Sequence, residues 1–288
     1  MRPHLILTLL VSILAWGCAP GEKSAPDAGS GGPAARIVSL APALTEILFA
    51  VGAGNRVVGV TAFCDYPPEA QALPKVGGYT TPSVEAILAL RPDLVLVSPA
   101  SGNRDPALAL RQAGLRVEVV PAETLDEAYA AVEQVGRVTG EDARGKTLAA
   151  EMRARIERAA ARASSLPKVR TIFCVQRDPL IVAGRGTLPA QILELAGGVN
   201  VVAADRYPRI GIETVLAEAP EVVVQSRMDL ADSGEERAAL EFWKRWPAIP
   251  AVRDGKVFVI DGTTAFRAGP RVADAVEMLS GILHGARR

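Results

Sequence analysis

The sequence is poor in histidine, and this scarcity excludes several kinds of chemistry. Only two of its 288 residues are histidines, His4 and His284. His4 falls in a segment that we expect to be removed, and His284 is expected to be a solvated residue at the end of the last helix. Zinc sites and Ser/His/Asp or Cys/His catalytic arrangements depend on imidazoles. We therefore expect no enzyme activity and no metal site, and a hydrolase is the least expected class.

Net charge and nucleotide-binding motifs are lacking as well. The 32 basic and 32 acidic residues cancel, so no overall field attracts DNA or RNA, and we expect no nucleic-acid partner. No P-loop or dinucleotide fingerprint occurs, and Gly184-Arg185-Gly186 predicts a turn. At 49% hydrophobic and 22% charged residues, the chain can bury a full core and has the length of roughly two domains.

The N-terminus has the layout of an export signal. Arg2 precedes an apolar run from Leu5 to Trp16, which is too short to span a bilayer. The sequence Ala15-Trp16-Gly17-Cys18 resembles a bacterial lipobox, in which the cysteine is lipidated after cleavage. We expect a signal peptide over 1–17, then lipidated Cys18 and a flexible Gly/Ser/Pro tether over 18–35. Ordinary secretory cleavage beside an incidental cysteine is the alternative.

From residue 36 onward, short β-branched runs alternate with helical stretches, which is typical of α/β proteins. The runs 36–40, 57–61, 94–97 and 117–120 predict strands, and 44–51, 82–90 and 105–113 predict helices. Thr124 and Glu127 form a capping box that opens a helix to about residue 138.

The second half of the chain repeats part of the first. VEAILALRPDLVLV (84–97) aligns without a gap with IETVLAEAPEVVVQ (212–225). EILFAVGAGNRVV (46–58) matches QILELAGGVNVV (191–202) after one deletion. Because the two similarities occur in the same order, they predict two similar α/β lobes, over residues 36–140 and 167–288.

A long helix is predicted between the lobes, over residues 141–166. This segment lacks proline until Pro167 and is rich in strong helix formers. Leu148, Met152, Ile156 and Ala160 form a narrow apolar stripe. At ~1.5 Å per residue such a helix runs roughly 35 Å, enough to connect two lobes as a strut. Cys64 and Cys174 fall in different lobes, so we expect two unpaired thiols.

These features resemble the periplasmic binding proteins with a helical backbone (class III), which serve cobalamin, haem and iron-siderophore importers. The resemblance covers residues 36–284 and is most specific in SLAPALTEILFAVGAGNRVVGVTAFCDYPPEA (39–70), VEAILALRPDLVLV and RAGPRVADAVEMLSGILH (267–284). It implies two Rossmann-like α/β lobes joined by one long helix, and it is strongest to the cobalamin-binding type.

The resemblance also implies a ligand held flat between aromatic rings at the lobe interface. Tyr66, Tyr79 and Tyr207 match positions in that cleft, and stiff rings suit a flat macrocycle. A packed turn residue is the alternative for Tyr66. The family's cobalamin binder carries tryptophans where Tyr79 and Tyr207 stand, and haem binders carry an iron-ligating tyrosine in the first of these loops. The alignment places Tyr79 in the ring-stacking column, although a slip of one residue would reverse this.

Charged residues complete the expected site. Arg177, Arg185, Arg206, Arg209 and Arg267 fall in inferred loops of the second lobe, where they could bind an anionic ligand group or be solvated, and Arg271 could be structural. We assign Arg177, Arg209 and Arg267 to the ligand. Glu85 and Glu213 are the repeat's matched acids. The resemblance implies that they dock onto arginines of a two-fold permease, the alternative being stabilisation of the helix starts.

Together these features predict an exported, lipid-anchored, monomeric solute-binding protein of an ABC importer that captures cobalamin or a related corrinoid. The expected partners are a permease dimer with its ATPase subunits, and the membrane is contacted through the lipid anchor only. No resident cofactor is expected, since the ligand is cargo. Haem or ferric-siderophore binding is the alternative within the class. An exported corrinoid-binding sensor or scaffold without a transport role is the alternative of another class.

Overall fold

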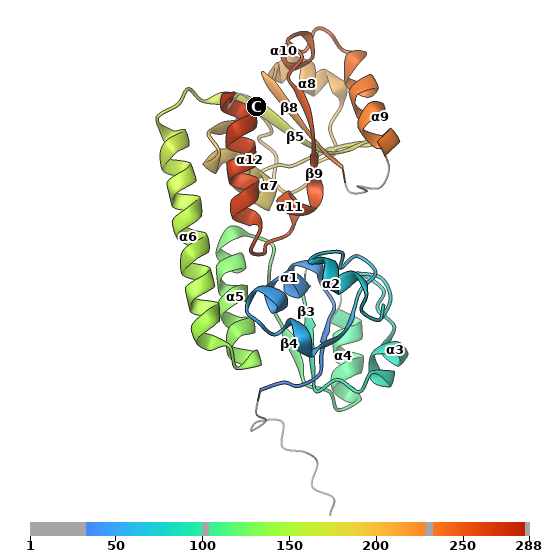
Figure 1. The fold of residues 1–288 in the computed structure, drawn as a ribbon. Coiled ribbons are helices and arrows are strands. Elements are labelled where there is room, and N and C mark those ends of the chain that lie inside the picture. The colour runs from blue at the N-terminus through green and yellow to red at the C-terminus, as the bar shows by residue number, and fades with distance from the viewer. Residues whose placement is uncertain (1–32, 100–103, 228–232, 286–288) are drawn as a thin grey trace, which may run out of the picture. The chain divides into compact units, whose positions relative to one another are not determined.

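The structure is a computed structural model that describes residues 33–99, 104–227 and 233–285. By their contacts, residues 32–288 form one compact unit. Within it, two sheets are each flanked by helices, which confirms the predicted α/β class (Figure 1). Segment 1–17, Cys18 and most of the tether lie outside the described residues. In the described ranges no helix has the length and apolarity needed to cross a bilayer.

The first lobe is built on four parallel strands in the order β2-β1-β3-β4. Its strands are apolar at nearly every position because helices cover both faces of a parallel sheet, and all four residues of β3 are buried. Every strand and helix predicted in this lobe is found. The elements are β1 Ile37–Ser39, α1 Pro42–Ala50, the 3-10 turn η1 Gly54–Arg56, β2 Val57–Val60, α2 Pro68–Gln71, α3 Val84–Ala89, β3 Leu94–Val97, α4 Arg104–Gln112 and β4 Val117–Val119.

The second lobe contains five strands, in the order β6-β5-β8-β9 with β7 also paired to β5. All pairings are parallel except that of β5 with β6, which forms a hairpin. The elements are β5 Val169–Arg177, β6 Leu180–Val182, α7 Leu188–Leu195, β7 Gly198–Asn200, α8 Ile212–Glu218, β8 Val222–Arg227, α9 Ser233–Lys244, α10 Pro250–Arg253, β9 Val257–Asp261, α11 Gly262–Phe266 and α12 Val272–His284.

The strand pairings confirm the internal repeat. The order β2-β1-β3-β4 in the first sheet is matched by β7-β5-β8-β9 in the second. The repeated sequences are the units α1 to β2 and α3 to β3 in the first lobe, and α7 to β7 and α8 to β8 in the second. The hairpin strand β6 is the addition that the repeat did not predict.

Helix α6 (Asp142–Ser164) connects the lobes, and α5 (Leu125–Thr139) runs antiparallel to it beside the first lobe (Figure 1). Helix α5 begins with the predicted capping box, and α6 covers the predicted strut. Met152 and Ile156 are buried as expected. The stripe continues through Ala149, Ala159 and Ala163 because the helical period is 3.6 and not 4.

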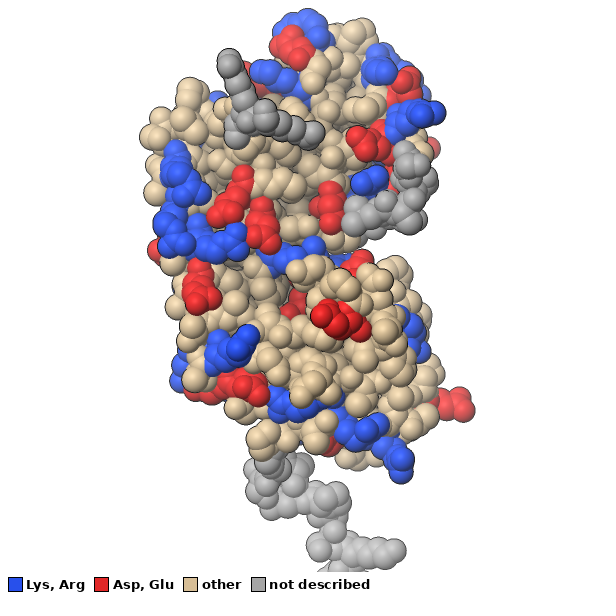
Figure 2. All heavy atoms as spheres, in the orientation of Figure 1, with Lys and Arg blue, Asp and Glu red and all other residues tan. Residues whose placement is uncertain are grey.

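The hydrophobic core is continuous between the lobes. One cluster of buried residues includes Ile47 of α1, Met152 of α6, Ile192 of α7 and Leu279 of α12, and smaller clusters lie under each sheet. Charged side chains of α6 support this packing, since Arg153 pairs with Glu133 of α5 and Arg155 pairs with two acids of α12. Figure 2 shows basic side chains gathered over α6 and mixed signs elsewhere on that face.

Cys64 and Cys174 are unpaired, as predicted, and both are buried. Burial raises the pKa of Cys174 to about 12, so this thiol is uncharged and unreactive at neutral pH. His284 corrects an expectation, because it is half-buried rather than solvated. Its Nε2 lies 3.0 Å from the Ala196 carbonyl at the end of α7 and donates to it, so the ring joins two helix ends.

Candidate functional site

A cavity of about 370 Å³ lies where the carboxyl ends of the first sheet's strands face the second lobe. Open α/β sheets offer their binding crevice at this edge. The first lobe contributes the start of α1, Phe63, Tyr79 and Ser98, and the second lobe contributes Phe266 and Arg267. We call this space the cleft. Its complete lining is Ala41, Pro42, Ala43, Phe63, Tyr79, Thr80, Ser98, Ala122, Phe266 and Arg267.

Aromatic rings dominate the large side chains of the cleft. Tyr79 lines it and is half-buried against the continuous core, and its contact with a ligand stays a prediction. Two phenylalanines that were not predicted as site residues also line it. Phe63, which follows β2, is 59% exposed, and Phe266 ends α11. Phe63 could have been noticed because it is a large apolar residue in the most specific matching stretch.

Tyr207 reaches the cleft through Phe266. The two ring centroids lie 6.4 Å apart, and Phe266 packs edge-on against Phe173 at 5.7 Å. Burial raises the pKa of the Tyr207 phenol, Arg206 lowers it and Glu123 raises it, with a net increase. Tyr207 is therefore an uncharged ring that packs on Phe266 beside the cleft, and it is not among the residues that line the cleft.

Tyr66 lies beside the interface of the lobes and is not among the cleft's lining residues. The residue is 43% exposed, and the guanidinium carbon of Arg271 lies 4.2 Å from the centroid of its ring. A cation over an aromatic face is attractive, so Arg271 fixes one face of the ring. Tyr66 is thus neither fully packed in its turn nor placed in the cavity.

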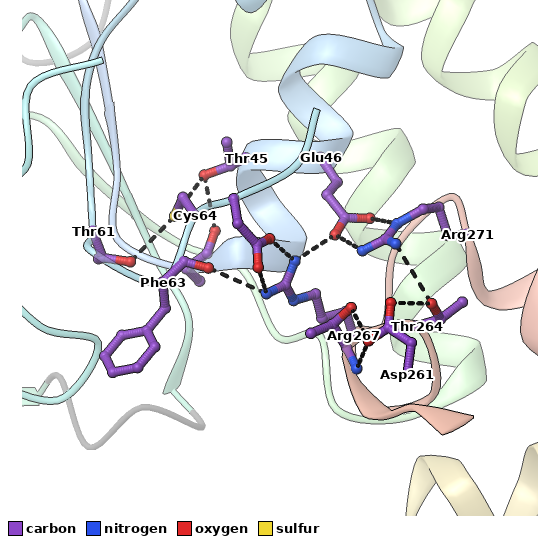
Figure 3. A network of polar contacts seen from close by, with 12 residues as sticks. Thr45, Glu46, Thr61, Phe63, Cys64, Asp261, Thr264, Arg267 and Arg271 are labelled. Atoms are coloured by element: carbon purple, nitrogen blue, oxygen red, sulfur yellow. Dashed lines mark hydrogen bonds and ion pairs between the residues drawn. The ribbon is translucent and has the colours of Figure 1, made fainter. Parts of the chain in front are cut away.

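Arg267 lies in the cleft wall but is already bound to acids of the opposite lobe (Figure 3). It pairs with Asp65 at 2.5 Å and Glu46 at 3.1 Å and donates to the Phe63 carbonyl at 3.2 Å. Burial alone would raise the pKa of Asp65, but the hydrogen bond and charge of Arg267 outweigh it and lower that pKa. The guanidinium therefore presents a largely neutralised surface to the cleft.

Comparison with known proteins identifies this architecture. Residues 37–264 match the family described as periplasmic binding protein. The chain belongs to the periplasmic binding protein family. Its members bind solutes outside the cytoplasm, and the family is not an enzyme class. A vitamin B12-binding protein of Vibrio cholerae is 34% identical over 260 residues, covering 89% of this chain and 91% of that protein.

Two solved structures are also similar over most of their length. The periplasmic vitamin B12-binding protein BtuF of Vibrio cholerae is 32% identical, with a TM-score of 0.78 over 88% of this chain and 98% of that one. The periplasmic haem-binding protein RhuT of Roseiflexus sp. RS-1 is 30% identical, with a TM-score of 0.80 over 88% and 99%. The predicted class III fold is thereby confirmed.

The remaining arginines of this periplasmic binding protein are not gathered in the cleft. Arg185 pairs with Asp205, and Arg206 pairs with Glu123 of the first lobe. Arg177 lines a separate hollow of about 420 Å³ in the second lobe, beside residues such as Gln176, Asp178 and Glu235. Arg209 is exposed in the loop before α8. Ligand binding by Arg177, Arg209 and Arg267 stays a prediction.

Glu85 and Glu213 occupy equivalent places in the two lobes of the binding protein. Each is an exposed first-turn residue, of α3 and of α8, and neither forms a hydrogen bond or ion pair with the part of the chain that the structure describes. Each also follows an aromatic residue of the site by six positions, from 79 to 85 and from 207 to 213. The repeat therefore places one ring and one free acid on each lobe.

Proposed function

We propose that this binding protein captures cobalamin, or a related corrinoid, in the cleft and delivers it to an ABC permease. The observation that carries the proposal is a lobe-to-lobe cavity lined by Phe63, Tyr79 and Phe266 around an arginine that acids have neutralised. The ligand is cargo, and no resident cofactor is needed. The similarity to vitamin B12-binding proteins supports this assignment.

Corrinoid and haem differ in the charge of their periphery, and the cleft favours the corrinoid. The corrin ring carries neutral amide side chains, whereas haem carries two carboxylates that call for free cations. Both terminal nitrogens of Arg267 already donate to Glu46, Asp65 and the Phe63 carbonyl. An anionic group at this point would have to displace Asp65. Stiff rings over a flat macrocycle need no such exchange.

Haem binding is the second candidate, because one observation favours it. Tyr79 lines the cleft and carries a phenol oxygen, a group that can ligate ferric iron, and a haem-binding protein shares the fold. The test is titration of the purified protein with cyanocobalamin and, separately, with haemin, followed by absorption and calorimetry. Saturable cyanocobalamin binding with weaker haemin binding supports the proposal. Tight haemin binding with a phenolate charge-transfer band and no corrinoid binding would refute it.

We further propose that Glu85 and Glu213 dock onto cationic pockets of the permease. Both carboxylates are exposed and unengaged, so they can enter an interface without losing an internal partner. Loss of one side of a buried interfacial ion pair typically costs ~2–5 kcal/mol, and charge reversal adds repulsion. The double variant Glu85→Lys, Glu213→Lys should abolish uptake of labelled cobalamin in cells while ligand affinity stays unchanged.

A matched control separates docking from helix-start stabilisation. Glu69 of α2 and Glu236 of α9 are also exposed first-turn glutamates, one in each lobe, outside the repeat. Glu69→Lys with Glu236→Lys makes the same charge change and should leave uptake intact. Normal uptake by the Glu85/Glu213 double lysine variant at equal expression would place the docking surface elsewhere. The alternative of a corrinoid-binding sensor or scaffold would then be tested in cells that lack the permease.

We also propose that the protein acts as a monomer tethered to the membrane through lipidated Cys18. The supporting observations are the lipobox-like sequence at 15–18 and a following stretch with almost nothing to bury. Such a tether lets the folded unit reach a permease in the same membrane.

A further inference from the structure

Four charged side chains from both lobes meet in a small cluster at the lobe interface. Glu46 of α1 accepts hydrogen bonds from Arg267 at 3.1 Å and from Arg271 at 2.9 and 2.6 Å. Arg267 also binds Asp65. Figure 3 shows the Glu46 carboxylate between the two guanidinium groups, with the Phe63 ring directed away from them. We call Glu46, Asp65, Arg267 and Arg271 the bridge.

Three of the four side chains of the bridge are largely buried, so their hydrogen bonds are shielded from water. The side chain of Glu46 is 2% exposed, and those of Arg267 and Arg271 are 11% and 18% exposed. A buried carboxylate with no partner is strongly unfavourable, so Glu46 holds both arginines, and with them the 267–271 loop, against α1. Backbone contact agrees with this, since a Cβ on Gly269 would lie 3.6 Å from the Ala43 carbonyl oxygen.

The bridge also extends to the surroundings of the cleft. Arg267 lines the cleft itself, and Arg271 packs on the Tyr66 ring while donating to Thr264, which in turn donates to Asp261 at the end of β9. Glu46 is therefore the one acid of the bridge that contacts both arginines. The other hydrogen bonds of Arg267 to the first lobe go to Asp65 and to the Phe63 carbonyl.

We propose that Glu46 and Arg271 are positioning residues of the ligand cleft. They hold the two walls at a fixed separation in the ligand-free protein and keep the Tyr66 ring in place beside the cleft. The effect on ligand rests on the function proposed above, whereas the effect on wall separation does not. Neither residue lines the cavity, so each acts through Arg267, Tyr66 and the spacing of the lobes.

The wall separation can be measured directly with spin labels. Ala89 and Ala217 are exposed, equivalent positions of the repeat in α3 and α8, and both can be changed to cysteine in the exported chain carrying Cys18→Ser. Cys64 and Cys174 are buried and escape labelling. Double electron–electron resonance should give a narrow distribution of the distance between the two labels when the bridge is unchanged. Glu46→Gln and Arg271→Ala should broaden it, and Arg271→Lys should broaden it less.

Glu218→Gln is the control, because it removes an acid from an exposed pair with Arg170 within the second lobe. It should leave the distance distribution narrow. A narrow, unshifted distribution in a folded Glu46→Gln protein overturns the proposal. Should Glu46→Gln fail to fold, Arg271→Lys and Arg271→Ala provide the same test, and narrow distributions in both overturn it.

Ligand affinity tests the second half of the proposal. Arg271→Lys should weaken cyanocobalamin binding about tenfold, equivalent to about 1.4 kcal/mol. In a Tyr66→Ala background the same change should cost much less, because the ring that Arg271 holds is gone. Equal losses in both backgrounds overturn the positioning of Tyr66. Failure of the wild-type protein to bind any corrinoid refutes the proposed function and leaves the distance measurements to decide the bridge.

Discussion

Gly145→Ala in α6 should destabilise the protein, although alanine is the better helix former. Gly145 is buried where α6 crosses α5, and a Cβ there would lie 2.9 Å from the Val132 carbonyl oxygen and 3.1 Å from Gly136 Cα. Helix propensity alone would favour alanine by about 1 kcal/mol. The clash is with backbone atoms, so relief requires one helix to move, at the upper end of the ~1–3 kcal/mol range for overpacking. We expect a net loss of about 2 kcal/mol.

Urea unfolding followed by circular dichroism measures this loss as a lower midpoint with an unchanged slope. Ala161→Gly, at an exposed position of the same helix, calibrates propensity and should lose about 1 kcal/mol. If Gly145→Ala instead raises the midpoint by the amount that Ala161→Gly lowers it, close packing of α5 on α6 is wrong. Close packing of α5 on α6 matters for function because α6 connects the lobes.

Three further predictions concern the ligand, pH and the membrane. Tyr79→Ala and Tyr207→Ala should each weaken cobalamin binding by about 1–3 kcal/mol in calorimetry, and phenylalanine should restore it because stacking needs only the ring. The pKa of Asp65 is lowered in the folded state, so ionised Asp65 stabilises the fold above the unfolded value of 3.8 and this stabilisation is lost as the pH falls below it. The urea midpoints of the wild type and Asp65→Asn should therefore converge as pH falls from 5 to about 3. Cys18→Ser should move the protein from membranes to the soluble fraction, and unchanged fractionation would disprove lipidation.

The fold was predictable because its signals are local or repeated. Continuous apolar runs marked the buried strands, and Thr124 with Glu127 marked the start of α5. The repeat required only that similar sequences recur in one order, and the strand pairings bear it out. The antiparallel strand β6 was missed because it has only three residues and pairs only with the adjacent strand β5. It has no counterpart in the first lobe, so the sequence repeat does not predict it.

The site was less accessible from sequence because its contacts join distant positions. Arg267 and Glu46 are 221 residues apart, and nothing in either segment says that the arginine is already paired. The same holds for Tyr66, whose stacking partner Arg271 belongs to the other lobe. Tyrosines near strand ends could be chosen by type and position, whereas the state of an arginine depends on which acids surround it in three dimensions.

A fixed cleft requires that something other than lobe closure controls release of the ligand. The continuous core and the bridge both resist separation of the walls, one along the helices and one beside the cleft. Glu85 and Glu213 each lie six residues beyond an aromatic residue of the site, at the first turn of a short helix. If the permease binds these two acids as proposed, we expect it to act on the loops that carry Tyr79 and Tyr207. Docking and ligand release would then be coupled through one short segment in each lobe. The permease would have to separate the cleft walls against the hydrogen bonds of Glu46 with Arg267 and Arg271.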